Sequence, residues 1–507
     1  MKADVHNSYW QDTADIRVFE PLKNNMEVDT LVIGGGIVGI TTAYFLTKKG
    51  VKTAVVDGST IEKNTTAKTT AKITYQHGAI YNDLISGVGK EKAYQYYDAN
   101  KKAIVLINNI IKEHNISCDY KTQTAYLYAA KENEMKKLEK EREAYEKLGM
   151  DYTYTKETKL PFKVIGALGI KNQGQFHPIK YIYALTKILE DSDCKIFENT
   201  CVLDVLGDKP PFKVITEYSE IKCQNVVMAC HYPFFKDGRH GMYFLRVYQS
   251  RSYVFGVRNN SKPFEGMYIN INDPIYSLRY QFDDRGALLL LGGGNHRTAE
   301  KEDERDSYNE LRSFCNKNFP NSNIEYIWSN QDCMTLDDIP YIGQMSSNIP
   351  GIYVATGFKK WGMTSGTIAA KIISNLILKD KGHDLEVFLP SRFNVIDSTK
   401  NFIINGLEVA ESFIMRLLPI ELEELEEVSE GEGKIIEYKG SKIGVYRDVD
   451  KYNAIIPNCT HMGCILKFNH AEKSWDCTCH GSRFDIYGNV IEGPATQPLK
   501  KVEIKKE

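Results

Sequence analysis

The first clear pattern of hydrophobic and polar positions lies at residues 28–57, where apolar runs alternate with glycine turns. VDTLVIGGG is a short apolar run that ends in glycines, as expected of a strand and a tight turn. IVGITTAYFLTKKG has the apolar face of a helix, with Gly50 as its C-cap, and VKTAVVD has the pattern of a second buried strand. Together the three segments predict a βαβ unit.

The pattern then changes along the chain. Residues 86–148 favour helices, and residues 196–290 favour strands such as RSYVFGV and GALLLLGGG. GIYVATGFKKWGMTSGTIAAKIISNLI predicts a strand, a glycine-rich turn and a helix. This order of elements is typical of an α/β nucleotide-binding domain with a second, mixed sheet.

A different region begins near residue 400. Residues 401–418 predict an amphipathic helix, and residues 421–432 contain seven glutamates, which indicates an exposed linker. From residue 425 onward, short strands alternate with turns and predict a small all-β domain. We therefore expect a domain over 1–395, a linking helix and acidic linker over 396–424, and a domain over 425–507.

Composition narrows the function classes. The chain has 507 residues, which predicts two or three domains, and its net charge of −2 does not suggest a nucleic-acid partner. It begins with a polar, acidic stretch and has no apolar run of about 18 or more residues, so we expect neither a secretory signal nor a transmembrane segment. These features predict a cytoplasmic protein.

The motif GGGIVG places glycines at the spacing of a dinucleotide-binding turn. Gly34, Gly36 and Gly39 stand between the first strand and the helix, and Asp57 closes the second strand. Small residues there let the backbone approach a pyrophosphate, and the carboxylate can accept hydrogen bonds from ribose hydroxyls. The alternative is a glycine-rich turn that binds no ligand.

Four of the eleven cysteines lie close together near the C-terminus, in CTHMGC and CTCHGS. Two thiols and two imidazoles from these motifs can hold a metal, and the ligand candidates are Cys459, His461, Cys477 and His480. A Cys₂His₂ zinc site and a metal-free thiol redox switch are the alternatives. The usual short spacing between two zinc-binding cysteines is not used here.

The two motifs, followed by GNVIEGPATQPLKKVEI at 488–504, closely resemble the Rieske [2Fe–2S] domain. The resemblance implies that Cys459, His461, Cys477 and His480 hold a [2Fe–2S] cluster, with the imidazoles raising its potential. In the respiratory-type branch of that family the two further cysteines form a disulfide across the loops. That implies a bond between Cys464 and Cys479.

Residues 9–380 resemble the FAD-dependent oxidoreductases of the D-amino-acid oxidase and glycine/sarcosine oxidase type. LDDIPYIG and ATGFKKWGMTSG carry this resemblance besides the βαβ unit. It implies FAD as cofactor, a GR2/DAO-like α/β fold with a Rossmann-type βαβ unit, and an interleaved mixed-sheet substrate domain over about 80–330. It also implies a helix N-terminus at the flavin, formed by Gly362, Met363 and Thr364.

The same resemblance suggests further contacts. The loop NTTAKTTAKITYQHG occupies the place where the family lays a segment along the cofactor, so Thr69, Thr70 and Lys72, or Lys68, are candidate cofactor ligands. Val202 is a candidate adenine contact.

No catalytic residue is assigned, and the candidates are His77, Arg279 and Tyr253, with a core position as the alternative for His77. Other substrate-carboxylate candidates on the strands are Arg246, Arg251 and Tyr276. Cys333 is a weak match to the family's covalent anchors, so we expect non-covalent FAD.

The two resemblances together predict an FAD-dependent dehydrogenase. It would oxidise the C–N bond of an amino acid or amine and pass electrons from flavin to the cluster and on to an external acceptor. One alternative is the reverse flow, in which a donor reduces the cluster and the flavin reduces a small-molecule substrate. Another is a non-catalytic electron carrier or redox sensor.

Overall fold

The computed structural model describes residues 7–235, 240–259, 262–380, 386–392, 425–449 and 451–504. The predicted linking helix and linker over 396–424, which include the amphipathic helix at 401–418, lie outside these residues. Among the described helices, none combines the length and apolar character needed to cross a membrane.

The first sheet contains the predicted βαβ unit. β1 (Met26–Ile33) pairs in parallel with β2 (Thr53–Val56), and α2 (Ile37–Thr47) connects them. β10 (Glu220–Met228) lies on the other side of β1, and β17 (Ile352–Thr356) lies beyond it, both in parallel. The sheet order is β16-β17-β10-β1-β2-β7, and β8 and β9 extend from β10. The remaining strands are β7 (Lys195–Phe197), β8 (Val202–Leu206), β9 (Phe212–Thr216) and β16 (Tyr341–Gln344).

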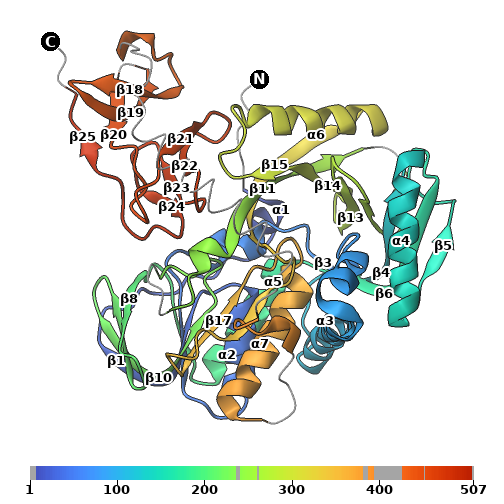
Figure 1. Ribbon diagram of the computed structural model, residues 1–507, viewed down its shortest axis with the longest axis horizontal. Coiled ribbons are helices and arrows are strands. Elements are labelled where there is room, and N and C mark those ends of the chain that lie inside the picture. The colour runs from blue at the N-terminus through green and yellow to red at the C-terminus, as the bar shows by residue number, and fades with distance from the viewer. Residues whose placement is uncertain are drawn as a thin grey trace.

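Two helices from distant parts of the sequence pack on this sheet. α7 (Gly362–Leu378) lies against α2, and a Cβ at Gly366 would lie 3.1 Å from the side chains of Ile37 and Val38. The glycine therefore allows the two helices to approach closely, and their N-termini lie at the same edge of the sheet (Figure 1). α1 (Tyr9–Asp12) and α5 (Pro178–Asp191) complete the helices of this domain.

The second sheet is mixed and has nine strands, in the order β15-β11-β14-β13-β12-β4-β6-β3, with β5 paired to β6. α3 (Tyr81–Glu113), α4 (Glu132–Leu148) and α6 (Arg305–Asn318) accompany this sheet (Figure 1). Its position in the chain agrees with a substrate domain inserted into the nucleotide-binding domain. Its strands are β3 (Lys72–Ile73), β4 (Lys121–Ala129), β5 (Thr153–Thr155), β6 (Gly166–Gln175), β11 (Val247–Arg258), β12 (Met267–Asn270), β13 (Ser277–Asp283), β14 (Gly286–Arg297) and β15 (Asn323–Thr335).

The C-terminal region is all-β in its described part. It consists of two four-stranded sheets, β18-β19-β20-β25 and β21-β22-β23-β24. It lies beside β11, β15 and α6 of the substrate domain (Figure 1). The strands are β18 (Gly433–Tyr438), β19 (Ser441–Asp448), β20 (Lys451–Ile455), β21 (Leu466–Asn469), β22 (Ser474–Cys477), β23 (Arg483–Asp485), β24 (Val490–Glu492) and β25 (Lys501–Val502).

Candidate functional site

The glycine turn between β1 and α2 has no room for side chains. Gly34 has a φ of +114°, and a Cβ there would lie 2.4 Å from the carbonyl oxygen of Ala229. A Cβ at Gly39 would lie 1.8 Å from the carbonyl oxygen of Gly34, and Gly36 is the N-cap of α2. The bare backbone at the start of a helix fits the pyrophosphate of a dinucleotide.

Asp57 ties the end of β2 to this turn. One carboxylate oxygen accepts hydrogen bonds from the Gly35 amide at 2.7 Å and from Asn64 Nδ2 at 2.9 Å, and the other accepts from the Ser59 amide at 2.8 Å. A carboxylate has about four acceptor positions, so capacity remains for a ribose hydroxyl. Val202 begins β8, and Cys201 before it lies 3.7 Å from the Cβ position of Gly58, so the adenine-contact candidate lies close to Asp57.

The loop at 64–78 contacts the start of α2 through a residue that the sequence pattern did not single out. Thr66 Oγ1 accepts a hydrogen bond from the amide of Ile37 at 3.0 Å, at the first turn of α2. Lys72, in contrast, is directed at the substrate sheet, where its Nζ donates to the Tyr268 carbonyl at 2.8 Å and to Ser277 Oγ at 2.6 Å. Burial and the nearby Arg279 lower the pKa of Lys72 to about 7.

The predicted flavin-facing helix begins at Gly362, followed by Met363 and Thr364. Among the described residues no side chain caps this end, so its amide groups and positive dipole end are available to a negatively charged edge. Thr364 Oγ1 donates to the Thr74 carbonyl at 3.0 Å and thereby joins α7 to the 64–78 loop.

His77 is a buried histidine whose two nitrogens have protein partners. Nδ1 accepts from the Tyr96 hydroxyl at 2.6 Å, and Nε2 donates to the Thr74 carbonyl at 2.8 Å. Its ring stacks on Trp361 at 4.8 Å, and burial lowers its pKa to about 3. The neutral imidazole therefore supports the loop from within the core, and a catalytic role for His77 stays a prediction.

The other catalytic candidates also have protein partners. Arg279 Nε donates to the Thr70 carbonyl at 2.6 Å, and burial lowers the pKa of this arginine to about 9. The Tyr253 hydroxyl lies 2.8 Å from His296 Nε2. These contacts hold Arg279 and Tyr253 in place, and a catalytic role for either one stays a prediction. Two of the further carboxylate candidates also donate hydrogen bonds within the protein, Arg246 to the Pro390 carbonyl and the Tyr276 hydroxyl to Glu310. Arg251 lies at the contact with the C-terminal domain, where it pairs with Glu472.

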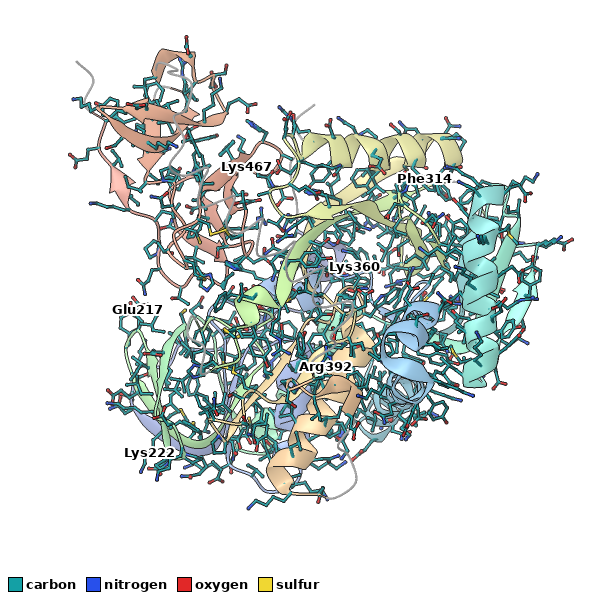
Figure 2. All side chains as sticks on the ribbon, in the orientation of Figure 1. Glu217, Lys222, Phe314, Lys360, Arg392 and Lys467 are labelled. Carbon is teal, nitrogen blue, oxygen red and sulfur yellow. A yellow bond between two sulfur atoms is a disulfide. The ribbon has the colours of Figure 1, made fainter. Side chains whose placement is uncertain are left out.

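A pocket lies between the 64–78 loop, the substrate sheet and the start of α7. Lys360 lies at this pocket with its side chain 29% exposed, and its Nζ is 2.7 Å from Asp332 Oδ2 (Figure 2). Ser252 and Asn330 also donate to Asp332. Lys360 lies within ATGFKKWGMTSG, where the resemblance assigned a role only to Gly362, Met363 and Thr364, and Asp332 stands in no recognisable motif. The pocket is lined by Lys68, Thr69, Thr70, Lys72, Ser252, Tyr253, Val254, Ile269, Ile275, Ser277, Gly292, Gly293, Asn295, Asn330, Asp332, Lys360 and Trp361.

The two cysteine–histidine motifs form a matching pair of turns. The amide of Gly463 donates to the Cys459 carbonyl at 2.8 Å, and the amide of Gly481 donates to the Cys477 carbonyl at 3.1 Å. Both glycines have positive φ, which closes each turn around its histidine. Cys459 and Cys477 share a hydrogen bond, which lowers the pKa of Cys459 to about 7 and raises that of Cys477 well above its usual value.

The two histidines stand side by side at the tips of these turns. Their ring centroids are 5.1 Å apart. His480 Nε2 donates to the Phe244 carbonyl at 3.1 Å, so Nδ1 carries a lone pair, and it has no hydrogen-bond partner among the described residues. Burial lowers the pKa of His480 to about 4 and keeps it neutral. A buried neutral nitrogen of this kind is a suitable metal ligand.

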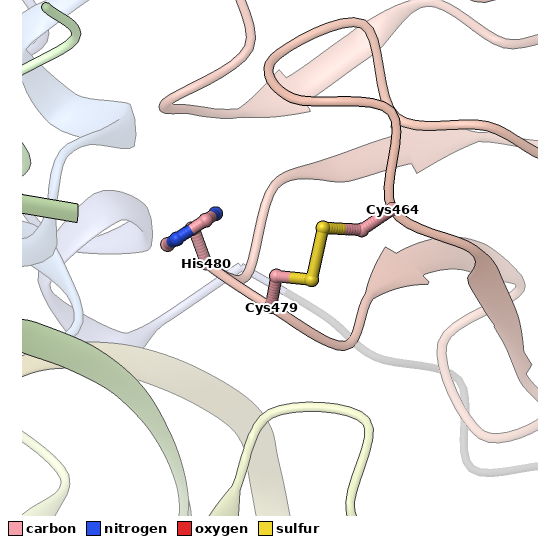
Figure 3. A group of neighbouring side chains, drawn as sticks. All are labelled: Cys464, Cys479 and His480. Atoms are coloured by element: carbon pink, nitrogen blue, oxygen red, sulfur yellow. A yellow bond between two sulfur atoms is a disulfide. The ribbon is translucent and has the colours of Figure 1, made fainter. Parts of the chain in front are cut away.

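The two further cysteines are joined in a disulfide, Cys464–Cys479, which connects the turns (Figure 3). Their sulfur atoms and a ring nitrogen of His480 lie within 4.8 Å of one another. Bonded sulfurs are not thiolates and cannot supply the anionic ligands of an iron–sulfur cluster. The donor set that fits a [2Fe–2S] cluster is therefore Cys459, Cys477, His461 and His480.

The histidine end of the cluster loops faces the nucleotide-binding and substrate domains. The ring of Tyr232 lies 6.2 Å from that of His461 and 6.1 Å from that of His480. Gln331 Nε2 donates to the Gly481 carbonyl at 2.8 Å. A Cβ at Gly481 would lie 2.6 Å from the side chain of Gln249, so this glycine allows the close approach.

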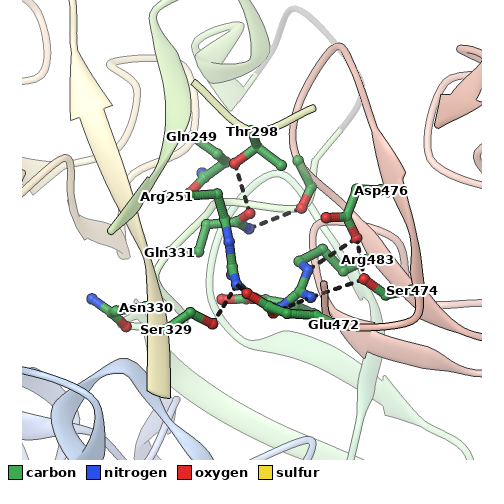
Figure 4. A network of polar contacts seen from close by, with 12 residues as sticks. Gln249, Arg251, Thr298, Ser329, Asn330, Gln331, Glu472, Ser474, Asp476 and Arg483 are labelled. Atoms are coloured by element: carbon green, nitrogen blue, oxygen red, sulfur yellow. Dashed lines mark hydrogen bonds and ion pairs between the residues drawn. The ribbon is translucent and has the colours of Figure 1, made fainter. Parts of the chain in front are cut away.

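A buried ion network fixes the same contact (Figure 4). Arg251 is 1% exposed, and its Nη2 lies 2.5 Å from both carboxylate oxygens of Glu472. Arg483 Nη2 donates to Glu472 at 2.6 Å, and its Nε donates to Asp476 at 3.0 Å. Glu492 lies within 4 Å of both guanidinium groups. Two cations and three carboxylates thus lie between the domains.

Family comparison agrees with both halves of this geometry. The model of the FAD dependent oxidoreductase family matches residues 29–376. The chain belongs to that family. The Rieske [2Fe-2S] domain model matches residues 419–503, so this family member carries a C-terminal Rieske domain. Both predicted resemblances, the fold class, the oxidoreductase class and the cofactors FAD and [2Fe–2S] are confirmed.

Relatives of this FAD dependent oxidoreductase share its architecture. One relative is YhfW of Bacillus subtilis (strain 168), whose name describes a Rieske 2Fe-2S iron-sulfur protein. The two chains are 39% identical over an alignment that covers 99% of this chain and 98% of YhfW. Glycine oxidase from Geobacillus kaustophilus matches with a TM-score of 0.61, 17% identity, and 72% and 99% coverage of the two chains. L-proline dehydrogenase from P. horikoshii matches with a TM-score of 0.60, 20% identity, and 73% and 98% coverage.

We predict that acid precipitation will release the yellow chromophore of this oxidoreductase into the supernatant. Cys333 is buried, its sulfur lies 3.4 Å from Thr356 Oγ1, and burial raises its pKa to about 11. A protonated thiol is a poor nucleophile for attachment to a flavin. Absorbance of the separated fractions measures the release. Colour that stays in the pellet of the wild type, but not of a Cys333→Ser variant, would contradict the prediction.

Proposed function

We propose that this protein is an FAD-dependent dehydrogenase that oxidises the C–N bond of an amino acid or secondary amine. FAD accepts two electrons as a hydride, and the Rieske cluster carries one electron at a time. The protein would pass the electrons in two single steps through the cluster to an external one-electron acceptor. The proton from the substrate nitrogen would leave to solvent.

The observation that carries this proposal is the burial of the cluster histidines against the flavoprotein domains. His461 is 4% exposed and His480 is 1% exposed, and Tyr232 and Phe244 supply the nearest contacts. A cluster that served only an outside partner would need its histidine end open to that partner. The orientation therefore supports electron exchange within the chain.

The residues beside His461 in the first cluster loop give an external acceptor a route of approach. Thr460, Met462 and Gly463, which flank His461, are each partly exposed. An acceptor bound there would lie beside the first cluster loop without displacing Tyr232. This arrangement supports a relay in which the flavoprotein side and the acceptor side of the cluster are different.

The pocket favours an enzyme over a carrier that has no substrate. It lies beside the predicted flavin-facing helix, and three lysines, Lys68, Lys72 and Lys360, line it together with Asp332. Lys360 pairs with Asp332, and burial lowers the pKa of Lys68 and that of Lys72, the latter to about 7. A substrate carboxylate beside Lys68 and Lys72 would favour their charged forms. The names of the structural relatives, a glycine oxidase and an L-proline dehydrogenase, support an amino acid or amine.

The proposal is tested by anaerobic titration of the purified protein with a panel of amino acids and amines. Bleaching of the flavin absorbance, followed by the appearance of a reduced-cluster EPR signal, is the expected result. If the cluster is reduced by dithionite but no compound of the panel bleaches the flavin, the substrate class is wrong. If the reduced protein instead transfers its electrons to an added imine, the flow runs in the reverse direction.

A further inference from the structure

The segment that follows β10 connects the cofactor turn with the cluster loops. The amide of Ala229 donates to the Ile33 carbonyl at 2.8 Å, and its own carbonyl lies against Gly34. Tyr232 comes only three residues later, and three extended residues span at most about 11 Å. Its ring already lies beside both cluster histidines. One short segment therefore contacts both cofactor sites.

The same segment is also held to the flavin end of the cofactor site. The carbonyl of His231 accepts a hydrogen bond from Thr356 Oγ1 at 2.6 Å. Thr356 ends β17, immediately before the turn that leads to α7. His231 has a φ of +67°, an uncommon conformation for a residue with a side chain. This local turn points the His231 carbonyl at β17 and places the next side chain, Tyr232, at the cluster.

The contacts of Tyr232 are made by its ring. The side chain is 3% exposed and packs in one core with residues of β1, β10 and β17. Its hydroxyl is buried and has no hydrogen-bond partner among the described residues. The ring, and not the hydroxyl, is thus the part that fills the space between the domains.

We propose that Tyr232 is the packed contact through which electrons pass between the flavin end of the FAD site and the Rieske cluster. This inference rests on the proposed function. In each step one electron leaves the reduced flavin and one iron of the cluster is reduced, while Tyr232 keeps its proton and its electrons. Two such steps, together with release to solvent of the proton that the hydride brought, would return the flavin to the oxidised state, and the external one-electron acceptor would reoxidise the cluster after each.

The test measures this step directly in the FAD- and cluster-loaded protein. A deazaflavin flash reduces the flavin, and absorbance follows electron transfer to the cluster. We expect Tyr232→Leu to slow the transfer by about tenfold, because packed atoms are removed between the two sites. Tyr232→Phe should restore the rate, since the ring remains. Iron content, the cluster potential and the EPR g-values report separately whether the cluster is intact.

The matched control is Tyr243→Leu. Tyr243 is buried in the same core, but its hydroxyl donates to the Met345 carbonyl. Among the ring contacts of the described residues, none joins Tyr243 to a cluster histidine. This change should affect thermal stability without slowing electron transfer. If Tyr232→Leu loses iron, Tyr232→Met fills the space without an aromatic ring and replaces it in the test.

The outcomes separate the two proposals. Transfer in Tyr232→Leu, or in Tyr232→Met, as fast as in the wild type would overturn the role of Tyr232. Slow transfer in Tyr232→Phe would overturn the assignment to the ring. If the wild-type flavin and cluster exchange no electrons at all, the proposed function itself fails.

Discussion

Replacing Cys459 with alanine is expected to remove the cluster and leave the FAD site intact. In the predicted ligand set Cys459 supplies one of the two thiolates, and its hydrogen-bond partner Cys477 lies on the other loop. Loss of even an outer-shell partner weakens metal sites by about 10–100-fold, so loss of a direct ligand should exceed that. The nucleotide turn is formed by other residues, Gly34, Gly36 and Asp57, and should keep FAD.

The consequence for activity is a separation of the two half-reactions. An amine that bleaches the wild-type flavin should still bleach it in the Cys459→Ala protein, while turnover with a one-electron acceptor should fall by more than about a hundredfold. Low-temperature EPR and iron analysis show whether the cluster is present. The wild type should contain two irons per chain and give a signal of low average g-value.

A second variant distinguishes the effect of the ligand type on the cluster potential from the effect of losing iron. His480→Cys should keep iron but lower the potential, because a thiolate replaces a neutral imidazole. Cys315→Ala is the matched control, since Cys315 is a buried free cysteine of the substrate-domain core and should leave the iron content unchanged. Zinc in the wild-type site, or unchanged turnover without the cluster, would end the relay proposal.

Local motifs made much of this molecule predictable. The βαβ unit and the two cysteine–histidine loops each lie within about 30 consecutive residues, so spacing alone places their groups together. The hydrogen bond from the Gly35 amide to Asp57 lies within the βαβ unit, and the bonds that close the turns at Gly463 and Gly481 lie within the cysteine–histidine loops. All of them therefore join residues that are close in the sequence. Periodicity likewise predicted the strand-rich substrate region and the all-β end of the chain.

Contacts between distant segments were not predictable in this way. Arg251 was a candidate for a substrate carboxylate because it lies on a strand of the substrate region, yet it pairs with Glu472, which is 221 residues away. Tyr232 reaches His461 and His480 only because the C-terminal domain docks beside β11. Nothing in the sequence around Tyr232 indicates this docking. The burial of His77, which was a catalytic candidate with a core position as its alternative, is likewise determined only by the fold.

The second large effect is expected at the buried ion network. Glu472→Gln would leave Arg251 and Arg483 without the carboxylate that lies between them. Breaking a buried ion pair by removing one partner costs about 3–5 kcal/mol, because the remaining charge stays buried. Since Arg251 belongs to the substrate domain, the loss should weaken docking of the Rieske domain as well as folding. Denaturant unfolding and limited proteolysis between the domains measure the two effects.

Arg305→Ala is the matched control for Glu472→Gln, because it removes another ion pair between the substrate domain and the Rieske domain. Arg305 pairs with Glu432 at 3.3 Å, but its side chain is 50% exposed. Exposed pairs contribute about 0–1 kcal/mol, so this variant should be close to the wild type. If Glu472→Gln proves no less stable than Arg305→Ala, the network does not hold the domains together.

The pH dependence gives an independent check on the same residue. Burial alone would raise the pKa of Glu472, but attraction to Arg251 and Arg483 outweighs it and holds the pKa well below its usual value. A carboxylate with a depressed folded-state pKa contributes stability that is fully present above its unfolded pKa of about 4.3 and is lost as the pH falls further. From pH 7 to 5 this group should therefore change nothing, and below about pH 4.3 the wild type should lose stability more steeply than Glu472→Gln. Parallel acid unfolding curves for the two proteins would show that the ion network does not depend on an ionised Glu472.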